Sequence, residues 1–356
     1  MHRTYRRGGW SLLLALTVTL AMLAGGCGSE SVSTTSPTNT VEDTKPAVED
    51  TESAVEDTES AGMKVALLVA GVTTDLGFFQ VVFDAAKAAA DAGGHELAVT
   101  ERVEAAQAVE ALRGYARDGF DLVIGAGEEF TAPAIEVGSE FPDTWFGVIN
   151  GNDSAENVAS FVIDQMALGY LSGVLAATDS KTGVVGVINA LEFESTARLL
   201  AGFEQGVADT SADVKVLSVY TGDFNDPALG KAAAAAMIDE GADVLVNALD
   251  LGAQGVIEAA QEGDGVHLIG FFSDQAAGFE VPELYFTSAI ASWPAATKNL
   301  IEIAASGEIQ GQVYVLDVKD ERFAYLAPYG PDVSDEAKAL VDETLSDIRA
   351  GTLVFP

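Results

Sequence analysis

Residues 64–80 read Lys-Val-Ala-Leu-Leu-Val-Ala-Gly-Val-Thr-Thr-Asp-Leu-Gly-Phe-Phe-Gln, and an alanine-rich run follows them. The mostly apolar run 64–70 predicts a strand buried on both faces, as in a parallel sheet. Apolar residues then recur at spacings of three and four over 80–90, which predicts a helix. The intervening loop, 71–79, lies at the carboxyl end of a strand, where doubly wound sheets bind ligands. We therefore take as candidate ligand-binding residues Asp75, Phe78, Phe79 and Gln80. A simpler alternative is that the two phenylalanines only pack the top of the helix.

The alternation of strand and helix continues from Met63 to the end of the chain. Strands are expected near 64–70, 95–100, 121–125, 145–149, 158–163, 183–188, 214–220, 243–247, 266–270, 284–290, 313–318 and 322–328. Helices are expected near 79–91, 103–117, 131–140, 165–178, 194–208, 227–240, 252–262, 294–305 and 335–349. This regularity predicts an α/β fold with parallel sheets flanked by helices, and two successive runs of it predict two similar lobes with a ligand cleft between them.

The N-terminal segment, residues 1–26, has the features of a signal peptide. Three arginines precede an apolar stretch that is too short to span a bilayer comfortably, and small residues lead to Cys27. Small residues before the only cysteine resemble a bacterial lipoprotein signal, in which that cysteine is lipidated and becomes the new N-terminus. An ordinary secretory peptide is the alternative. A single cysteine excludes an intramolecular disulfide in either case.

Residues 27–62 are expected to form a disordered acidic tether behind the lipid anchor. They are rich in Ser, Thr, Glu and Asp, and they repeat Ala-Val-Glu-Asp-Thr-Glu-Ser at 47–53 and 54–60. Only Ala and Val are apolar in each copy, so no coiled-coil seam can form, and the composition is typical of disorder. The whole chain carries a formal net charge of −37. Nucleic acid and anionic lipid headgroups are therefore unsuitable partners, because both require clustered Lys and Arg.

Enzymatic motifs are incomplete or missing. The run Gly125-Ala126-Gly127-Glu128-Glu129-Phe130 approaches a dinucleotide fingerprint, but it lacks the third glycine and places carboxylates where a pyrophosphate would lie. The sequence contains neither Gly-x-Ser-x-Gly nor a P-loop, and its three histidines are scattered. A single cysteine and three scattered histidines cannot supply a zinc site or a Cys/His or Ser/His catalytic site. We expect a protein without a cofactor and without catalytic residues.

Several motifs in the second half of the chain match one known family in order and spacing. They are Gly169-Tyr170-Leu171-Ser172-Gly173, Gly183-Val184-Val185-Gly186-Val187-Ile188, Gly202-Phe203-Glu204-Gln205-Gly206, Phe224-Asn225-Asp226-Pro227, Gly241-Ala242-Asp243-Val244, Ile269-Gly270-Phe271-Phe272-Ser273-Asp274-Gln275 and Thr287-Ser288. Over about 64–328 the chain resembles the basic membrane protein (PnrA-like) family, the substrate-binding lipoproteins of ABC importers that include purine-nucleoside receptors.

The resemblance implies a type I periplasmic-binding fold, with two Rossmann-like lobes, three crossover segments that form a hinge, and a ligand held between the lobes. On this basis we assign the N-terminal lobe to 63–162 plus 286–308, and the C-terminal lobe to 163–285 plus 309–356. A binding protein of this kind needs rigid lobes, a hinge and a few polar groups among aromatics rather than a nucleophile.

The resemblance also implies a ligand site, in which this chain differs from the family at three positions. The first loop resembles the family's Asp-x-Ser-Phe-Asn-Gln, which implies that Phe78 stacks on a base. Where the family has Asn, Asp and Lys, this chain has Phe79, Phe272 and Ala291, and the last two positions are implied to hold ribose hydroxyls. We therefore expect a flatter, less polar ligand, such as a free base, a modified nucleoside or another aromatic metabolite. The expected walls are Phe78, Phe79, Phe130, Phe193, Phe272 and Trp293, and the expected polar contacts are Asp75, Gln80, Glu129, Asp250 and Asp274.

The resulting prediction is a monomeric, lipid-anchored solute receptor on the extracytoplasmic side of the cell membrane. Its implied partners are the small-molecule ligand and the permease and ATPase of an ABC importer. Closure of the lobes around ligand is the expected mechanism. Two alternatives remain open: a lipoprotein sensor that presents ligand to a membrane receptor, and, from a different class, an extracytoplasmic hydrolase on a doubly wound fold.

Overall fold

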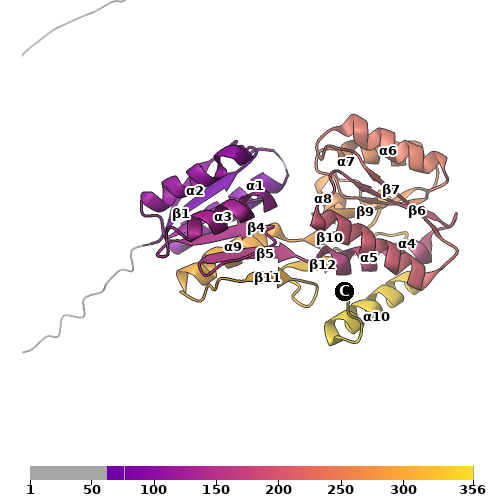
Figure 1. The fold of residues 1–356 in the computed structure, drawn as a ribbon. Coiled ribbons are helices and arrows are strands. Elements are labelled where there is room, and N and C mark those ends of the chain that lie inside the picture. Colours follow the sequence, from indigo (N-terminus) through magenta and orange to yellow (C-terminus); the bar gives the residue numbers. More distant parts are fainter. Residues whose placement is uncertain (1–61, 76, 356) are drawn as a thin grey trace, which may run out of the picture. The chain divides into compact units, whose positions relative to one another are not determined.

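The computed structural model describes residues 62–75 and 77–355, which are drawn as the coloured ribbon in Figure 1. The predicted signal peptide, Cys27 and all of the predicted tether except Gly62 lie outside these residues. Within the described part of the chain, no helix combines the length and the apolar character that crossing a bilayer requires.

The first sheet has six strands in the order β11-β5-β4-β3-β1-β2, and all neighbours are parallel. Its strands are β1 (Lys64–Val69), β2 (Glu96–Thr100), β3 (Leu122–Ala126), β4 (Trp145–Ile149), β5 (Val158–Ile163) and β11 (Val313–Leu316). All five residues of β3 are buried, as are the last five residues of β1. The prediction that the run after Lys64 is a strand buried on both faces is therefore confirmed.

The second sheet repeats this plan in the order β12-β10-β9-β8-β6-β7. Its strands are β6 (Val184–Asn189), β7 (Lys215–Tyr220), β8 (Val244–Asn247), β9 (His267–Phe272), β10 (Tyr285–Ala291) and β12 (Ala324–Leu326). Only β12, at the edge, runs antiparallel to its neighbour. Two similar α/β units are thus present, as the alternation of elements predicts.

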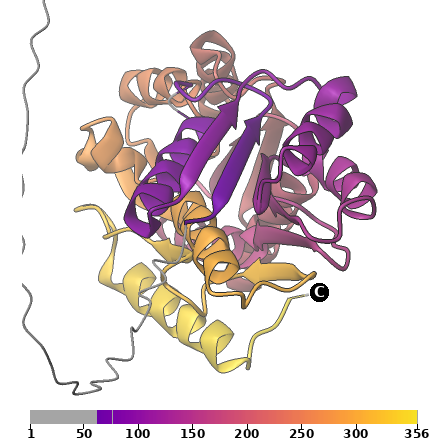
Figure 2. The same cartoon turned by 90° about the vertical axis from the view of Figure 1, so that its left-hand side faces the viewer.

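Helices cover both faces of the first sheet. Alternate residues of β1 point to opposite sides: Val65 and Leu67 lie in one apolar cluster with residues of α1 and α9, and Ala66 lies in another with residues of α2 and α3. Figure 2 shows these helices on either side of the indigo strands. The helices of the chain are α1 (Phe78–Gly93), α2 (Ala108–Arg117), α3 (Thr131–Gly138), α4 (Gln165–Asp179), α5 (Glu194–Thr210), α6 (Pro227–Asp239), α7 (Ala253–Glu262), α8 (Gln275–Gly278), α9 (Trp293–Ala305) and α10 (Asp335–Ala350), with 3-10 turns at Ala105–Gln107, Glu128–Phe130 and Pro282–Leu284.

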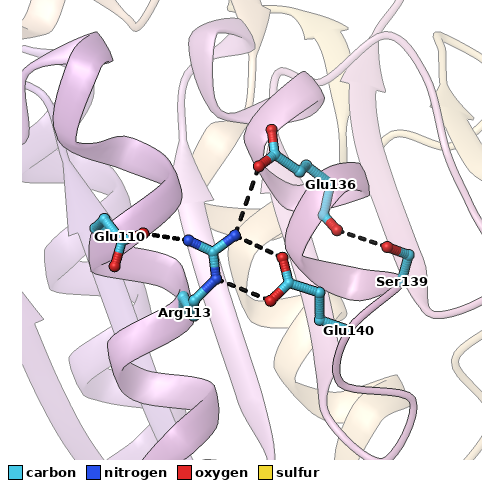
Figure 3. Close-up of polar contacts among 5 residues, drawn as sticks. All are labelled: Glu110, Arg113, Glu136, Ser139 and Glu140. Carbon is cyan, nitrogen blue, oxygen red and sulfur yellow. Dashed lines mark hydrogen bonds and ion pairs between the residues drawn. The ribbon is translucent and has the colours of Figure 1, made fainter.

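An arginine joins two of the outer helices of the first unit. The guanidinium of Arg113 on α2 donates to both carboxylate oxygens of Glu140, with Nε 2.9 Å from Oε2, and it also pairs with Glu110 and Glu136. Glu140 and Glu110 raise the pKa of Arg113, with Glu140 having the largest effect. Figure 3 shows how the group links α2 to the end of α3. A planar fork that meets a carboxylate with two bonds fixes geometry as well as charge.

The chain crosses between the sheets three times, and the second and third crossings differ from the boundaries that the sequence indicated. Strand β10 pairs with β9 in the second sheet, whereas β11 pairs with β5 in the first. The assignment of 286–308 to the first lobe and of 309–356 to the second is therefore wrong for these two strands. The crossings fall at 163–165, at 291–293 and at 316–324. An apolar strand carries no local signal for which of two similar sheets it joins, so its sequence could not settle this.

Glycines allow α4 and α5 to pack with their backbones in contact. A Cβ built on Gly202 would lie 2.1 Å from the carbonyl oxygen of Met166, and one on Gly173 would lie 2.3 Å from that of Phe203. Gly169 and Gly206 meet the opposite helix in the same way. The spacing of four residues in each pair places the glycines on one helix face. These glycine motifs, on which the family resemblance partly rests, thus have a packing function.

Candidate ligand-binding site

The loop between β1 and α1 is organised by Asp75. Its Oδ1 accepts hydrogen bonds from the backbone N–H groups of Gly77, at 2.9 Å, and Gln80, at 3.0 Å, and its Oδ2 accepts one from Phe79 at 3.3 Å. A carboxylate at a helix N-terminus satisfies donors that the helix itself leaves free and is favoured by the helix dipole. The predicted ligand contact of Asp75 is thus already engaged with the backbone, and its first role is to shape the loop.

Phe78 packs this loop against Trp293, the first residue of α9. Its ring lies edge-on to Trp293, with centroids 5.5 Å apart and planes at 90°, and its centroid is 5.4 Å from that of Phe79. Trp293 is only 5% exposed, whereas Phe78 is half-buried. Edge-to-face packing of this kind holds the ring of Phe78 in place while leaving part of it accessible.

Asp250 follows β8 of the second sheet, and its carboxylate faces the loop between β1 and α1. A Cβ built on Gly77 would lie 2.8 Å from Oδ2 of Asp250, so the carboxylate rests directly against the first loop. Burial raises the pKa of Asp250 to about 6, and Asp75 contributes through like charge. Among residues 62–75 and 77–355, no donor forms a hydrogen bond to this carboxylate and no cation pairs with it. Within this part of the chain it is an uncompensated carboxyl, next to the residue that precedes Phe78.

Two further loops meet beside the ends of β3 and β6. Glu128 accepts a hydrogen bond from Asn152 Nδ2 at 2.7 Å, and its pKa is raised mainly by burial and then by Glu194 of α5. Glu129 folds its carboxylate back over Gly127, whose φ of +125° suits glycine. Phe193, just before α5, is 43% exposed. Sequence reasoning named Glu129 and Phe193 but missed Glu128 and Glu194, which lie next to them.

Two of the predicted aromatic walls pack within the protein. Phe130 is fully buried in the apolar cluster that β1, β3, α2 and α3 form, and its side chain covers Gly125. We correct its assignment to the site, because the 3-10 turn before α3 points this side chain into the core. Phe79 lies over Gly71, where its ring would be 2.5 Å from an added Cβ. Its position in the first loop is therefore partly structural.

The turn after β9 presents Phe272 and Asp274. Phe272 has a left-handed backbone with φ of +70°, and its ring lies edge-on to Phe271 at 4.9 Å. Such a conformation is uncommon for a bulky residue and is found where the surroundings impose it, often at functional sites. Asp274 is exposed, and its Oδ1 accepts a hydrogen bond from the N–H of Ala277 at 3.2 Å at the start of α8.

The structure thus links Asp75, Phe78, Phe79, Asp250 and Trp293 into one group, in which Gln80 takes part through its N–H. Phe193, Phe272 and Asp274 lie at carboxyl ends of strands in the second sheet. Sequence reasoning did not select three buried amide side chains at these ends, namely Asn189, Asn247 and Gln275. The sequence pattern that could have indicated two of them is a polar last residue in an otherwise apolar strand, namely Asn189 in β6 and Asn247 in β8.

Two shallow hollows lie elsewhere, at the amino-terminal edge of the first sheet. They measure about 390 and 420 Å³, and both are lined by Asp121 and Asp143. They contain none of the predicted ligand residues. We prefer the carboxyl ends of the strands, because open α/β sheets bind ligands there. In the described residues, no three or more acidic, His or Cys side chains are grouped so as to hold a metal ion.

Known proteins match this chain over most of its described length. The profile of a family described as ABC transporter substrate-binding protein PnrA-like matches residues 63–349. The chain is 26% identical over 294 residues to a purine-binding protein of Brucella abortus, covering 82% of each chain. It is 32% identical over 188 residues to basic membrane protein B of Borreliella burgdorferi, covering 51% of this chain and 54% of that protein. A solved ABC transporter solute-binding protein of Conexibacter woesei has a TM-score of 0.65 and 29% identity, and it covers 83% of this chain and 99% of that one.

Proposed function

We propose, from the premise that this chain belongs to the PnrA-like family of ABC transporter substrate-binding proteins, that it captures a flat aromatic solute such as a purine between its two lobes. Membership of the family means that the protein is an extracytoplasmic, non-enzymatic solute-binding protein whose partners are a small molecule and a transporter. The two six-stranded units have the arrangement of a type I periplasmic-binding fold. The finer proposal concerns the ligand, the residues and the membrane anchor.

One observation carries the ligand proposal: the partly exposed ring of Phe78 and the uncompensated carboxyl of Asp250 meet at the same loop. An aromatic face stacks on any planar base, and a carboxylate accepts hydrogen bonds from N–H groups at the edge of a heterocycle. A purine offers both features. The name of the relative from Brucella abortus supports this class of ligand.

Closure of the lobes is the proposed mechanism. The first lobe is built on the first sheet and the second lobe on the second, and the three crossings at 163–165, 291–293 and 316–324 form the hinge. Ligand that stacks on Phe78 gains a contact with Asp250 only when the lobes are together, so it favours the closed state.

Ribosides should bind less well than bases. The two positions that would hold ribose hydroxyls are Phe272 and Ala291, and neither side chain can form a hydrogen bond. A ligand hydroxyl that loses its partner costs about 1 to 3 kcal/mol. The test is mass spectrometry of small molecules released from denatured residues 63–356, followed by thermal-shift titration with adenine, hypoxanthine, adenosine and inosine. Stabilisation by none of the four would contradict a purine ligand.

Phe78→Ala is expected to weaken binding of the ligand so identified by about 1 to 3 kcal/mol, because one stacking face is lost. Isothermal titration calorimetry measures the change. The matched control is Phe120→Ala, since Phe120 is also half-buried and edge-on to another aromatic ring, Tyr115, but lies at the opposite edge of the first sheet. Equal affinity of the two variants would remove Phe78 from the site.

The membrane anchor is proposed to be a lipid on Cys27, followed by the acidic segment 28–62 as a tether. Each buried methylene of an acyl chain adds about 0.8 kcal/mol to membrane binding. We expect the full-length protein to fractionate with membranes and Cys27→Ala to be lost from them, with ligand affinity of the two proteins unchanged. Retention of Cys27→Ala on the membrane would show that another segment anchors the chain.

A further inference from the structure

A single buried amide connects the ends of β8 and β9. The side chain of Gln275 is 3% exposed, and its Nε2 lies 3.2 Å from the carbonyl oxygens of Asn247 and Leu249 and 3.3 Å from that of Phe271. Asn247 is the last residue of β8, Leu249 lies in the loop after it, and Phe271 is near the end of β9. The two hydrogens of one NH₂ group are thus shared among three acceptors at the ends of two neighbouring strands.

Residues of β10 fix the orientation of this amide. Oε1 of Gln275 accepts a hydrogen bond from the hydroxyl of Tyr285 at 3.3 Å, and the backbone N–H of Gln275 donates to Oγ of Ser288 at 3.2 Å. Tyr285 and Ser288 are both in β10 and both buried. The amide is therefore clamped between β10 and the two loops that it joins.

The carbonyls that Gln275 binds immediately precede two residues of the proposed site. Leu249 precedes Asp250, the carboxyl that rests against Gly77, and Phe271 precedes Phe272, whose backbone is left-handed. A peptide plane that is fixed at its carbonyl fixes the start of the next residue as well. Loss of the amide would therefore release both residues at once.

We propose that Gln275 is a positioning residue, whose buried amide holds the loops after β8 and β9 so that Asp250 and Phe272 face the ligand together. The inference rests on the proposed function for what these residues bind, but the arrangement of the loops can be tested without ligand. Gln275 touches neither the first lobe nor the ligand in this scheme; it acts through the two loops.

The chain offers a matched control in the first unit. Asn157 is 8% exposed, and its Nδ2 also donates to three carbonyl oxygens, those of Gly138, Phe141 and Thr144, at 3.1, 2.9 and 2.8 Å. These carbonyls lie in the segment that leads into the amino-terminal end of β4, on the edge away from the proposed site. Gln275→Met and Asn157→Leu remove the same chemistry in side chains of nearly the same shape.

The test without ligand is a titration of Asp250. The chemical shift of its carboxyl carbon is measured by NMR from pH 3 to 8, and the midpoint gives the pKa. The carboxyl that acts on Asp250 in the described structure is Asp75, and burial is the larger cause of its raised pKa. In Gln275→Met we expect the midpoint to fall from about 6 toward the 3.8 of a free carboxyl, because the loop moves into solvent. In Asn157→Leu the midpoint should stay where it is in the natural protein.

The second test is affinity for adenine, measured at a temperature where urea titration shows each variant to be folded. Gln275→Met should bind at least about fivefold more weakly, the lower end of what a lost buried hydrogen bond costs, whereas Asn157→Leu should match the natural protein. If adenine does not bind, affinity is measured with whichever of hypoxanthine, adenosine and inosine does. If none of the four binds, the ligand proposal fails and the NMR result still decides the role of Gln275. An unchanged Asp250 midpoint in Gln275→Met would overturn the inference.

If Gln275→Met is too unstable to study, a milder variant tests the same inference. Tyr285→Phe removes the partner of Oε1 and leaves both hydrogens of the amide in place. We expect a smaller fall of the Asp250 midpoint in this variant. No fall in Tyr285→Phe, with Gln275→Met unfolded, would mean that Gln275 stabilises the second lobe without positioning Asp250.

Discussion

Asp250→Asn is expected to raise the free energy of unfolding of the ligand-free protein at pH 7 by about 2 to 3 kcal/mol. The natural carboxylate is held out of water beside Gly77 and near Asp75, and residues 62–75 and 77–355 provide it with neither a hydrogen-bond donor nor a cation. An amide of the same shape occupies the same space without charge. Urea denaturation followed by circular dichroism measures the difference.

The same substitution should change how stability depends on pH. Burial raises the pKa of Asp250 from 3.8 to about 6, so the folded state binds the proton more tightly than the unfolded state does. Stability therefore falls as the pH rises from about 4 to about 6, and the full loss is present above pH 6. Asp250→Asn should lack this component, so the gain in stability should be large at pH 7 and small at pH 4.

Asp274→Asn is the matched control. Asp274 also follows a strand of the second sheet, but its carboxylate is exposed and caps α8, a role that Asn fills equally well. We expect its stability to stay within about 0.5 kcal/mol of the natural protein at both pH values. If Asp250→Asn behaved like Asp274→Asn, Asp250 would be solvated and the lobes would not be together in the ligand-free protein.

A stabilising Asp250→Asn that also binds ligand more weakly would explain why the carboxyl is present. Binding sites retain groups that lower the stability of the empty protein when those groups contribute to function. Here the ligand would supply the N–H donors that the described residues do not, and the unfavourable carboxyl would become a favourable contact only in the complex.

Gly202→Ala is expected to lower the free energy of unfolding by about 3 kcal/mol, toward the upper end of the range for overpacking. The added methyl would lie 2.1 Å from the carbonyl oxygen of Met166 and 3.0 Å from the backbone nitrogen of Tyr170. Both obstacles are backbone atoms of α4, so no side chain can rotate away. Helices α4 and α5 would have to separate, and α4 is buried along nearly its whole length.

Gly114→Ala is the matched control, because it also replaces a glycine within a helix but is not expected to destabilise the protein. Gly114 also lies within a helix, α2, but an added Cβ would have no atom within 4 Å. Alanine favours the helix by up to about 1 kcal/mol relative to glycine, so this variant should be neutral or more stable. Thermal unfolding that gave the two variants the same midpoint would show that α4 and α5 are less closely packed in solution.

Local sequence was sufficient for the strands, for the α-helices other than α8, and for selecting the first loop of the proposed site. Apolar runs and helical spacing place each strand near its observed position, and the carboxyl end of a strand is known once the following helix is known. Asp75 and Phe78 could be selected for that reason alone. These features depend on contacts between residues close together in the chain.

Three other features were decided by tertiary structure. Phe130 points into the core and not into the site because a 3-10 turn rotates the start of α3. Strands β10 and β11 join the sheets opposite to those expected, because either sheet could accept an apolar strand. The raised pKa of Asp250 and the amide clamp of Gln275 arise from groups far apart in the sequence that folding brings together. Burial and hydrogen bonding of a side chain are properties of its neighbours in space, and short-range sequence patterns do not specify those neighbours.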